Sequence, residues 1–207
     1  MAGGLCENAG GSSSGTMNDE DSKAGLRNKI SAALKNLPRE KRQTDSDKLR
    51  SSLKRETFFR QARSILFFAP LPEEVDLWPL LEETINSGKV VALPCFDTDR
   101  RIYHSRRVRD VQVEILSGQF GIREPIAGCI AVSLDDLDLI LVPGVAFDAR
   151  GRRLGRGHGY YDRLLERFRG KKVGIAFDEQ IVESVPWGNL DINMDFILTP
   201  TRLIGAV

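Results

Sequence analysis

The sequence predicts an α/β protein, a single domain with a mainly parallel, open sheet flanked by helices and an N-terminal helical segment. Short apolar runs, which suit strands buried on both faces, alternate along the chain with stretches of helical periodicity. The length of 207 residues suits one domain, and no internal repeat divides it. Together these two observations favour the α/β class.

The chain opens on a stretch that has almost nothing to bury. Residues 1–20 are rich in Gly, Ser and Asn, and we expect a disordered tail there, followed by one domain at 21–207. Met17 is an alternative start of the protein. The sequence alone does not choose between Met1 and Met17.

Two helices are expected next. Order should begin near Ser22, because apolar residues recur at helical spacing from Leu26 to Leu37. A second helix is expected over about 39–62. We interpret the charge run at 39–50 as its solvated face.

The remaining elements alternate between strand and helix. Buried strands are expected at 64–69, 89–93, 137–142, 172–177 and 196–198, a more exposed strand at 101–106, and helices at 77–87 and about 160–169. We expect Pro94 to stop the second of these strands. Ligands of open parallel sheets bind beyond the carboxyl ends of the strands, which here means the loops after Ala69, Leu93, Val142 and Phe177.

Composition excludes several classes of protein. Thirty basic residues against 29 acidic ones give a net charge of +1, which argues against a general nucleic-acid or membrane binder. Three separated cysteines, Cys6, Cys95 and Cys129, suit free thiols in a reducing compartment. No secretory signal or membrane-spanning run is evident. We therefore expect a cytoplasmic protein, and any anion site must be local.

Residues 150–159 form the most distinctive stretch of the chain, with four arginines and four glycines. Glycines let backbone N–H groups converge on a ligand, arginines bind phosphate or carboxylate, and a helix N-terminus follows directly. The stretch thus predicts an anion cradle, although a flexible basic surface loop has the same composition. Tyr160, Tyr161 and Asp162 favour the cradle. The spacing matches neither a dinucleotide fingerprint nor a Walker A loop.

The same stretch carries a resemblance to a known family. Residues 153–162 read RLGRGHGYYD, after Pro-Gly at 143–144 and Phe-Asp at 147–148. This pattern resembles the signature of 5-formyltetrahydrofolate cyclo-ligases, and the resemblance spans about 22–205. It implies a ligase that forms a C–N bond, converting 5-formyltetrahydrofolate to 5,10-methenyltetrahydrofolate as ATP becomes ADP and phosphate, with Mg²⁺ present.

The resemblance also implies which residues serve ATP. The ATP-binding set is Lys23, Arg27, Arg153, Leu154, Gly155, Arg156, Gly157, His158, Gly159, Tyr160 and Tyr161. Arg156 is expected to offset charge on the transferring phosphoryl group, and Tyr160 to orient the substrate. Asp162 is expected to ligate Mg²⁺ with help from Asp195. Lys23 and Arg27 share one helix face, which a solvated surface would also explain.

On the folate side the resemblance implies contacts from Leu71, Glu74 and Phe120, together with Arg156 and Tyr160. A carboxylate such as Glu74 can accept paired N–H donors from the pterin ring. An exposed acidic turn remains the alternative for Glu74, and a core position remains the alternative for Phe120.

Three positions depart from the family pattern, namely Gly188, Leu190 and Cys95. Gly188 and Leu190 leave open a non-catalytic folate- or nucleotide-binding protein. A sugar-phosphate isomerase on a similar fold is a second rival, but no carboxylate or lysine base stands out for it. Reduced folate and ATP are the expected partners of a monomer that binds neither nucleic acid nor membrane.

Overall fold

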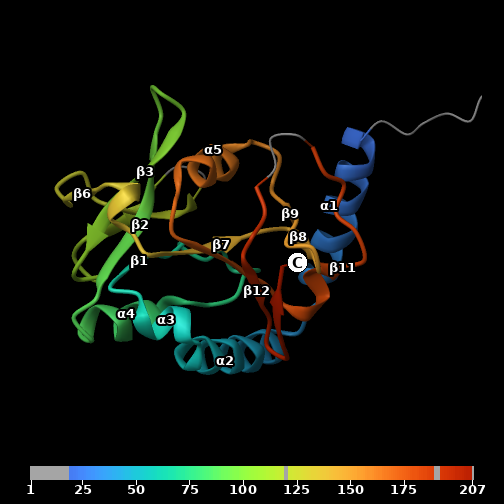
Figure 1. Ribbon diagram of the computed structural model, residues 1–207, viewed down its shortest axis with the longest axis horizontal. Helices are drawn as coiled ribbons and strands as arrows, with labels where there is room; N and C mark the ends of the chain where they lie inside the picture. The colour runs from blue at the N-terminus through green and yellow to red at the C-terminus, as the bar shows by residue number, and fades with distance from the viewer. Residues whose placement is uncertain (1–18, 119–120, 189–191, 207) are drawn as a thin grey trace, which may run out of the picture.

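The computed structural model describes residues 19–118, 121–188 and 192–206 (Figure 1). The helices are α1 (Asp19–Lys35), α2 (Arg39–Arg55), α3 (Thr57–Gln61), α4 (Trp78–Asn86) and α5 (Tyr160–Arg167), with short 3-10 helices at Leu134–Asp136 and Asp178–Gln180. The strands are β1 (Ser64–Leu66), β2 (Val90–Asp97), β3 (Ile102–Val108), β4 (Ile115–Ser117), β5 (Arg123–Pro125), β6 (Ala131–Val132), β7 (Leu139–Pro143), β8 (Ala146–Asp148), β9 (Arg153–Leu154), β10 (Lys171–Ile175), β11 (Ile181–Val182), β12 (Phe196–Leu198) and β13 (Leu203–Gly205).

A central sheet organises the part of the chain that the structure describes. Its strands follow the order β13-β12-β10-β7-β1-β2-β3-β6. The inner strands β12, β10, β7, β1 and β2 are all parallel, while β13, β3 and β6 join antiparallel at the edges. The predicted α/β class and the mainly parallel sheet are therefore confirmed.

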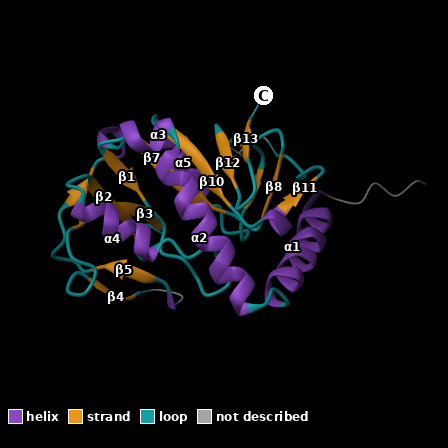
Figure 2. Ribbon diagram, turned by 90° about the horizontal axis from the view of Figure 1, so that it is seen from below, coloured by secondary structure: helices purple, strands orange, loops and turns teal. Residues whose placement is uncertain are grey.

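Helices cover both faces of this sheet. The helices α2, α3 and α4 lie along one face and α5 lies on the other, with α1 at one end (Figures 1 and 2). Leu53 of α2 and Leu81 of α4 belong to one buried cluster, and Leu165 of α5 belongs to a second. Alternate residues of β2 follow the same division, since Val91 packs in the first cluster and Ala92 in the second.

Strand β2 is longer than the sequence predicts. It continues through Pro94, which pairs with Ser105 of β3, so the expectation that Pro94 stops the strand is wrong. Strand β1 ends at Leu66, and its pairing with β2 does not pass Ala92. Beyond that point no strand pairs with this side of β2 among the described residues, and a proline without an N–H is tolerated there.

The N-terminal helices also differ in their bounds. Helix α1 begins at Asp19, inside the stretch expected to be a tail, and residues 1–18 lie outside the described residues. The helix expected over 39–62 divides at Glu56, whose extended backbone (φ −67°, ψ 135°) separates α2 from α3.

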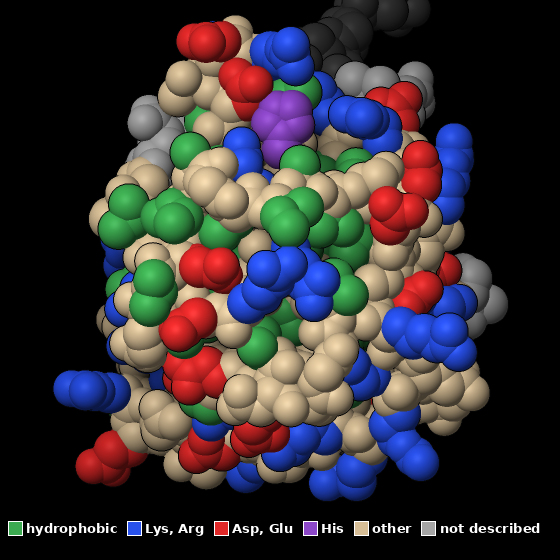
Figure 3. Space-filling model, turned by 90° about the vertical axis from the view of Figure 1, so that its left-hand side faces the viewer, with side chains coloured by type: hydrophobic (Ala, Val, Ile, Leu, Met, Phe, Trp, Pro, Cys, Tyr) green, Lys and Arg blue, Asp and Glu red, His purple; other side chains and the backbone are tan. Residues whose placement is uncertain are grey.

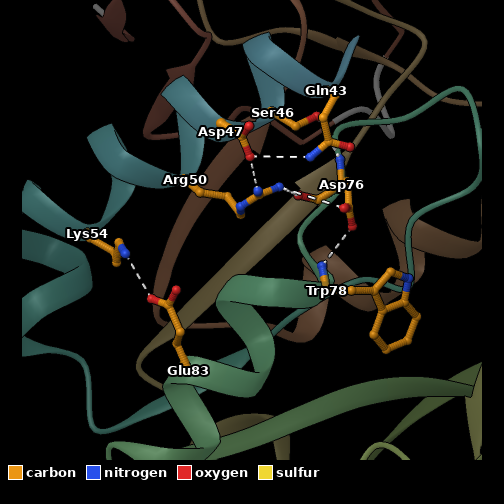
Figure 4. Close-up of polar contacts among 8 residues, drawn as sticks. All are labelled: Gln43, Ser46, Asp47, Arg50, Lys54, Asp76, Trp78 and Glu83. Atoms are coloured by element: carbon orange, nitrogen blue, oxygen red, sulfur yellow. Dashed lines mark hydrogen bonds and ion pairs between the residues drawn. The ribbon is translucent and has the colours of Figure 1, made fainter. Parts of the chain in front are cut away.

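Side chains of α2 form hydrogen bonds with the segment that joins β1 to α4 (Figure 4). Arg50 Nη1 donates to the Asp76 carbonyl (2.6 Å), and Asp76 N donates to Ser46 Oγ (3.1 Å). Asp76 Oδ1 in turn accepts from Trp78 N at the start of α4 (3.0 Å). The Arg50 side chain is only 12% exposed. The charge run at 39–50 is therefore partly buried, and its interpretation as a solvated face was incomplete.

Several short strands escaped the sequence analysis. Strands β4 and β5 form a two-stranded ribbon, and β8, β9 and β11 form a three-stranded sheet inside and beside the Gly/Arg stretch. Each has only two or three residues. An alternation of polar and apolar residues cannot be recognised over so short a length.

Candidate functional site

A cavity of about 280 Å³ lies at the carboxyl ends of the central strands. Its lining comes from the segments 68–74, 143–144 and 153–162, with Pro94, Tyr103 and Ile122. Three of the four loops predicted to approach a ligand, those after Ala69, Leu93 and Val142, contribute to this lining. The loop after Phe177 does not.

The Gly/Arg stretch is shaped by a buried aspartate. Asp148, 1% exposed, accepts at Oδ1 from the backbone N–H groups of Arg150 (2.9 Å) and Arg152 (3.2 Å), and at Oδ2 from Val185 N (2.9 Å). Gly151 turns the chain with φ of 81°, and a Cβ there would lie 2.6 Å from the Met194 carbonyl oxygen. Glycine is therefore required at this turn.

The stretch then opens toward the cavity and leads into α5. Gly157 and Gly159 have φ of 100° and 65°, in the left-handed region that side chains disfavour. Gly159 is the N-cap of α5, so the first turn of that helix presents its N–H groups beside the cavity. Arg27 of α1 supports the stretch from outside, since its Nε donates to the Gly155 carbonyl (2.9 Å).

Lys23 lies one turn before Arg27 on α1 and is half-buried. It is not among the cavity-lining residues, and Leu154 also lies away from the cavity, 2% exposed in the core. The remaining residues of the predicted ATP set, 153 and 155–161, line the cavity together, and Arg27 touches them from α1.

Arg153 and Asp162 form an ion pair within the cavity wall. Arg153 Nη2 donates to Asp162 Oδ1 (2.5 Å), and Nη1 donates to the Pro143 carbonyl (3.2 Å). The side chains are 4% and 27% exposed respectively. The guanidinium also lies over the Tyr161 ring, 5.7 Å from its centroid. Arg153 thus ties α5 to the end of β7 and orients Asp162.

Arg156 crosses the cavity mouth to the opposite segment. Its Nη2 donates to Glu73 Oε1 (3.1 Å) and Glu74 Oε1 (3.0 Å). Glu74 Oε2 accepts from Leu71 N (3.0 Å), which fixes the carboxyl group against its own loop. Burial raises the pKa of Glu74, while Leu71 N and Arg156 oppose that rise.

Aromatic side chains form the apolar side of the cavity. The Tyr103 ring packs edge-on against Tyr160 (centroids 5.9 Å apart) and obliquely against Tyr161 (5.7 Å). His158 stacks on Tyr160 at 5.5 Å. Burial raises the pKa of Tyr103 to about 12, with the charge of Glu124 adding to the shift. A flat, uncharged ring system would fit against this cluster.

Two further predicted residues are not placed at the cavity. Phe120 lies outside the described residues. Asp195 lies at the amino end of β12, where its Oδ2 accepts from Lys172 N (2.7 Å) near the start of β10. Since the cavity lies at the carboxyl ends of the parallel strands, the structure does not bring Asp195 to Asp162. Among the described residues no group of three or more His, Cys, Asp or Glu side chains is arranged to hold a metal.

The structure adds residues that the sequence analysis passed over. Glu73 shares Arg156 with Glu74, and Tyr103 joins the aromatic cluster from β3. Glu73 is adjacent in sequence to Glu74, a predicted site residue, and this adjacency could have identified it. Tyr103 reaches the cavity only because β3 folds back on β2, a long-range pairing that its neighbours in sequence do not reveal.

The surface around these elements carries mixed charge. Figure 3 shows one face of the molecule, on which basic, acidic and apolar side chains are interspersed. Such a face agrees with the net charge of +1 and with an anion site confined to the Gly/Arg stretch. Within the described residues, no helix combines the length and the apolar character needed to cross a bilayer.

Fold and cavity together define an α/β protein in which a Gly/Arg stretch and a helix N-terminus face a largely buried carboxyl group and an aromatic cluster. The model of the 5-formyltetrahydrofolate cyclo-ligase family matches residues 19–200. The chain therefore belongs to this family and is a ligase.

Named relatives agree with that assignment. The 5-formyltetrahydrofolate cyclo-ligase of Escherichia coli K12 is 34% identical over 149 residues, 69% of this chain and 80% of the relative. The mouse enzyme of the same name is 29% identical over 189 residues, 85% of this chain and 92% of the relative. The solved 5,10-methenyltetrahydrofolate synthetase of Aquifex aeolicus superposes with a TM-score of 0.81 at 38% identity, covering 89% of this chain and 92% of that one.

Proposed function

We propose that this chain closes 5-formyltetrahydrofolate to 5,10-methenyltetrahydrofolate and converts ATP to ADP and phosphate as it does so. The observation that carries the proposal is the cavity itself, which has the Gly/Arg stretch on one side and the Glu74 carboxyl group with tyrosines on the other. Family membership supplies the reaction, and this arrangement offers a separate place for each substrate.

The chemistry requires activation of a poor leaving group. The formyl oxygen attacks the γ-phosphorus of ATP and ADP departs, which leaves a phosphorylated oxygen on the one-carbon unit. The second folate nitrogen then attacks that carbon and loses its proton, and the C–O bond breaks to release phosphate. The protein mainly has to position the two substrates and stabilise charge.

The Gly/Arg stretch would hold the phosphates. Backbone N–H groups around Gly157 and the first turn of α5 point to where an anion would lie. Arg156, whose side chain is 51% exposed, would offset charge on the transferring phosphoryl group. Lys23 and Arg27 would support the nucleotide from α1, and Arg27 already contacts the stretch through Gly155.

The opposite wall would hold the folate. Glu74 would accept N–H donors of the pterin ring, and Leu71 would pack against it. Tyr160 would orient the substrate near the closing nitrogen, within the tyrosine cluster. The pKa of Glu74 is raised by burial, so paired N–H donors would stabilise its ionised form.

Mg²⁺ fits this site through one carboxylate. The ion prefers one or two carboxylates with phosphate oxygens and water, and Asp162 lines the cavity beside the cradle. We propose that Asp162 holds Mg²⁺ against the ATP phosphates, where the ion would neutralise phosphate charge. Asp195, at the amino edge of the sheet, is left out of this proposal. A cytoplasmic location and a monomeric state stay predictions. Cell fractionation would test the first, and size-exclusion chromatography would test the second.

An absorbance assay for the methenyl product tests the proposal. Purified protein should form product from 5-formyltetrahydrofolate only when ATP and Mg²⁺ are both present. An ATP-free reaction is the control. Binding of both substrates without product would instead favour the non-catalytic folate- or nucleotide-binding protein.

A further inference from the structure

Arg156 is shared between two adjacent carboxylates of another segment. A single nitrogen, Nη2, makes both contacts, at 3.1 Å to Glu73 Oε1 and 3.0 Å to Glu74 Oε1. The side chains of Glu73 and Glu74 are 35% and 12% exposed. The contact joins the Gly/Arg stretch to the opposite wall across the cavity mouth, and we call it the Arg156 latch.

The latch occupies donors that a phosphate would need. A guanidinium nitrogen such as Nη2 carries two N–H groups, and here both are directed at carboxylates. The two acidic groups also raise the pKa of Arg156, although burial acts in the opposite direction. Nη2 can therefore turn to a phosphoryl group only when these carboxylates let it go.

The latch also occupies an acceptor that the folate would need. Glu74 Oε2 accepts from Leu71 N (3.0 Å) and Oε1 accepts from Arg156 (3.0 Å), so paired N–H donors that reach both oxygens would share Oε1 with Arg156. A ligand that takes Oε1 leaves Arg156 attached to Glu73 alone. A single, partly exposed carboxylate holds an arginine far less firmly than two, one of them buried.

We propose that Glu73 is a positioning residue that holds Arg156 away from the phosphates until folate occupies Glu74. Folate binding then loosens the latch and makes Arg156 available to ATP. This inference rests on the proposed function. Either substrate bound alone must break the latch, and the second substrate finds it broken. The two substrates should therefore bind with positive coupling, and the coupling must be reciprocal.

The experiment measures that coupling rather than a single affinity. Calorimetry would give the Kd of a non-hydrolysable ATP analogue with and without saturating 5-formyltetrahydrofolate. In the unsubstituted protein, folate should tighten the analogue about fivefold or more. In Glu73→Gln the analogue alone should bind more tightly, because Arg156 is then held by Glu74 alone. In Arg156→Gln, which has no latch, the ratio of the two Kd values should fall toward one. Glu73→Asp, which keeps the charge, should bind the analogue more nearly as the unsubstituted protein does.

Controls separate the latch from general electrostatics. Removing a negative charge strengthens anion binding whether or not Arg156 is present, so a purely electrostatic role of Glu73 would tighten the analogue equally in both backgrounds. Glu82→Gln, on the exposed surface of α4, should leave both Kd values and the ratio unchanged. If Glu73 acts through Arg156, Glu73→Gln combined with Arg156→Gln should bind the analogue no more tightly than Arg156→Gln alone.

Three outcomes would overturn the inference. If both ligands bind but the ratio is one in the unsubstituted protein, or if Glu73→Gln tightens the analogue as much with Arg156→Gln as without it, the latch fails while the proposed function stands. If the unsubstituted protein binds no 5-formyltetrahydrofolate, the proposed function fails and the latch falls with it.

Discussion

The two walls of the cavity are built in different ways. The Gly/Arg wall takes much of its shape from neighbours in sequence, since Asp148 binds the amides of Arg150 and Arg152 only a few residues later, and Arg27 of α1 supports it from outside. The facing wall, 68–78, depends on α2, whose Ser46 and Arg50 reach across to it (Figure 4). The first wall would serve ATP and the second would serve folate.

This difference has a functional consequence. Substitutions in or behind the Gly/Arg wall should change the KM for ATP, whereas substitutions in α2 should change the KM for folate. Helix α2 itself contacts neither substrate in the proposal. Among the side-chain hydrogen bonds of the described residues, those of Arg156 to Glu73 and Glu74 join the two walls. Variants on either side therefore test whether the walls are as separate as their construction indicates.

The largest effect is expected from Asp162→Asn. Loss of the carboxylate charge should weaken Mg²⁺ binding, and turnover should fall by orders of magnitude with partial recovery at high Mg²⁺. The measurement is methenyl formation across a Mg²⁺ titration. Glu166→Gln, an exposed position on the same helix, is the matched control.

Because Asp162 also pairs with Arg153, a loss of stability in Asp162→Asn does not show whether Asp162 binds Mg²⁺. Asp162→Asn leaves the buried Arg153 without a charged partner, so unfolding free energy should drop by about 1–3 kcal/mol even if Asp162 never binds Mg²⁺. The Mg²⁺ titration is thus the deciding readout. Turnover near that of the unsubstituted protein at sub-millimolar Mg²⁺ would exclude Asp162 as the ligand.

A smaller effect is expected at α1. Arg27→Ala removes the hydrogen bond to the Gly155 carbonyl, and Lys23→Ala removes a charge one turn away. Each should raise the KM for ATP, by about tenfold for Arg27, with little change in the KM for folate. Lys29→Ala, exposed on the same helix, is the control. Equal shifts in both KM values would contradict the separation of the walls.

Arg50→Met should act on the other wall. The variant loses the bond to the Asp76 carbonyl, so the segment that carries Leu71 and Glu74 becomes less ordered. We expect the KM for folate to rise about threefold to tenfold and the KM for ATP to change little. Arg55→Met on the exposed end of α2 provides the comparison. A selective rise in the KM for ATP would show that this segment does not serve folate.

The smallest effect is expected from removing residues 1–16. This stretch has no core-forming pattern, and α1 begins after it, at Asp19. Melting temperature and both KM values should stay the same as those of the full chain. A marked loss of either stability or turnover would show that the stretch contributes to one of the walls.

Elements whose structure is decided by neighbouring residues were predicted correctly from the sequence. The strand at 196–198 and the helix within 77–87 were predicted close to their observed bounds because apolar periodicity marks them directly. Residues 153–162 could be singled out because their glycines, their arginines and the helix that follows are contiguous in the sequence. Its lining of one cavity with Leu71 and Glu74 agrees with the edge rule for parallel sheets.

The predictions were incomplete where contacts between distant segments decide the structure. The continuation of β2 through Pro94 depends on where β1 ends, and the burial of Arg50 depends on a loop that follows it by a helix and a strand. The separation of Asp195 from Asp162 depends on which end of β12 faces the cavity. None of these relations is encoded in the residues immediately around the positions concerned.

The central claim is that both walls serve one coupled reaction. The most direct test measures methenyl product and ADP in the same reaction of the unsubstituted protein with 5-formyltetrahydrofolate, ATP and Mg²⁺. The account predicts equal amounts of the two products throughout the time course, and neither product when either substrate is omitted. ADP formation that does not depend on folate, or binding of both substrates without methenyl product, would contradict it.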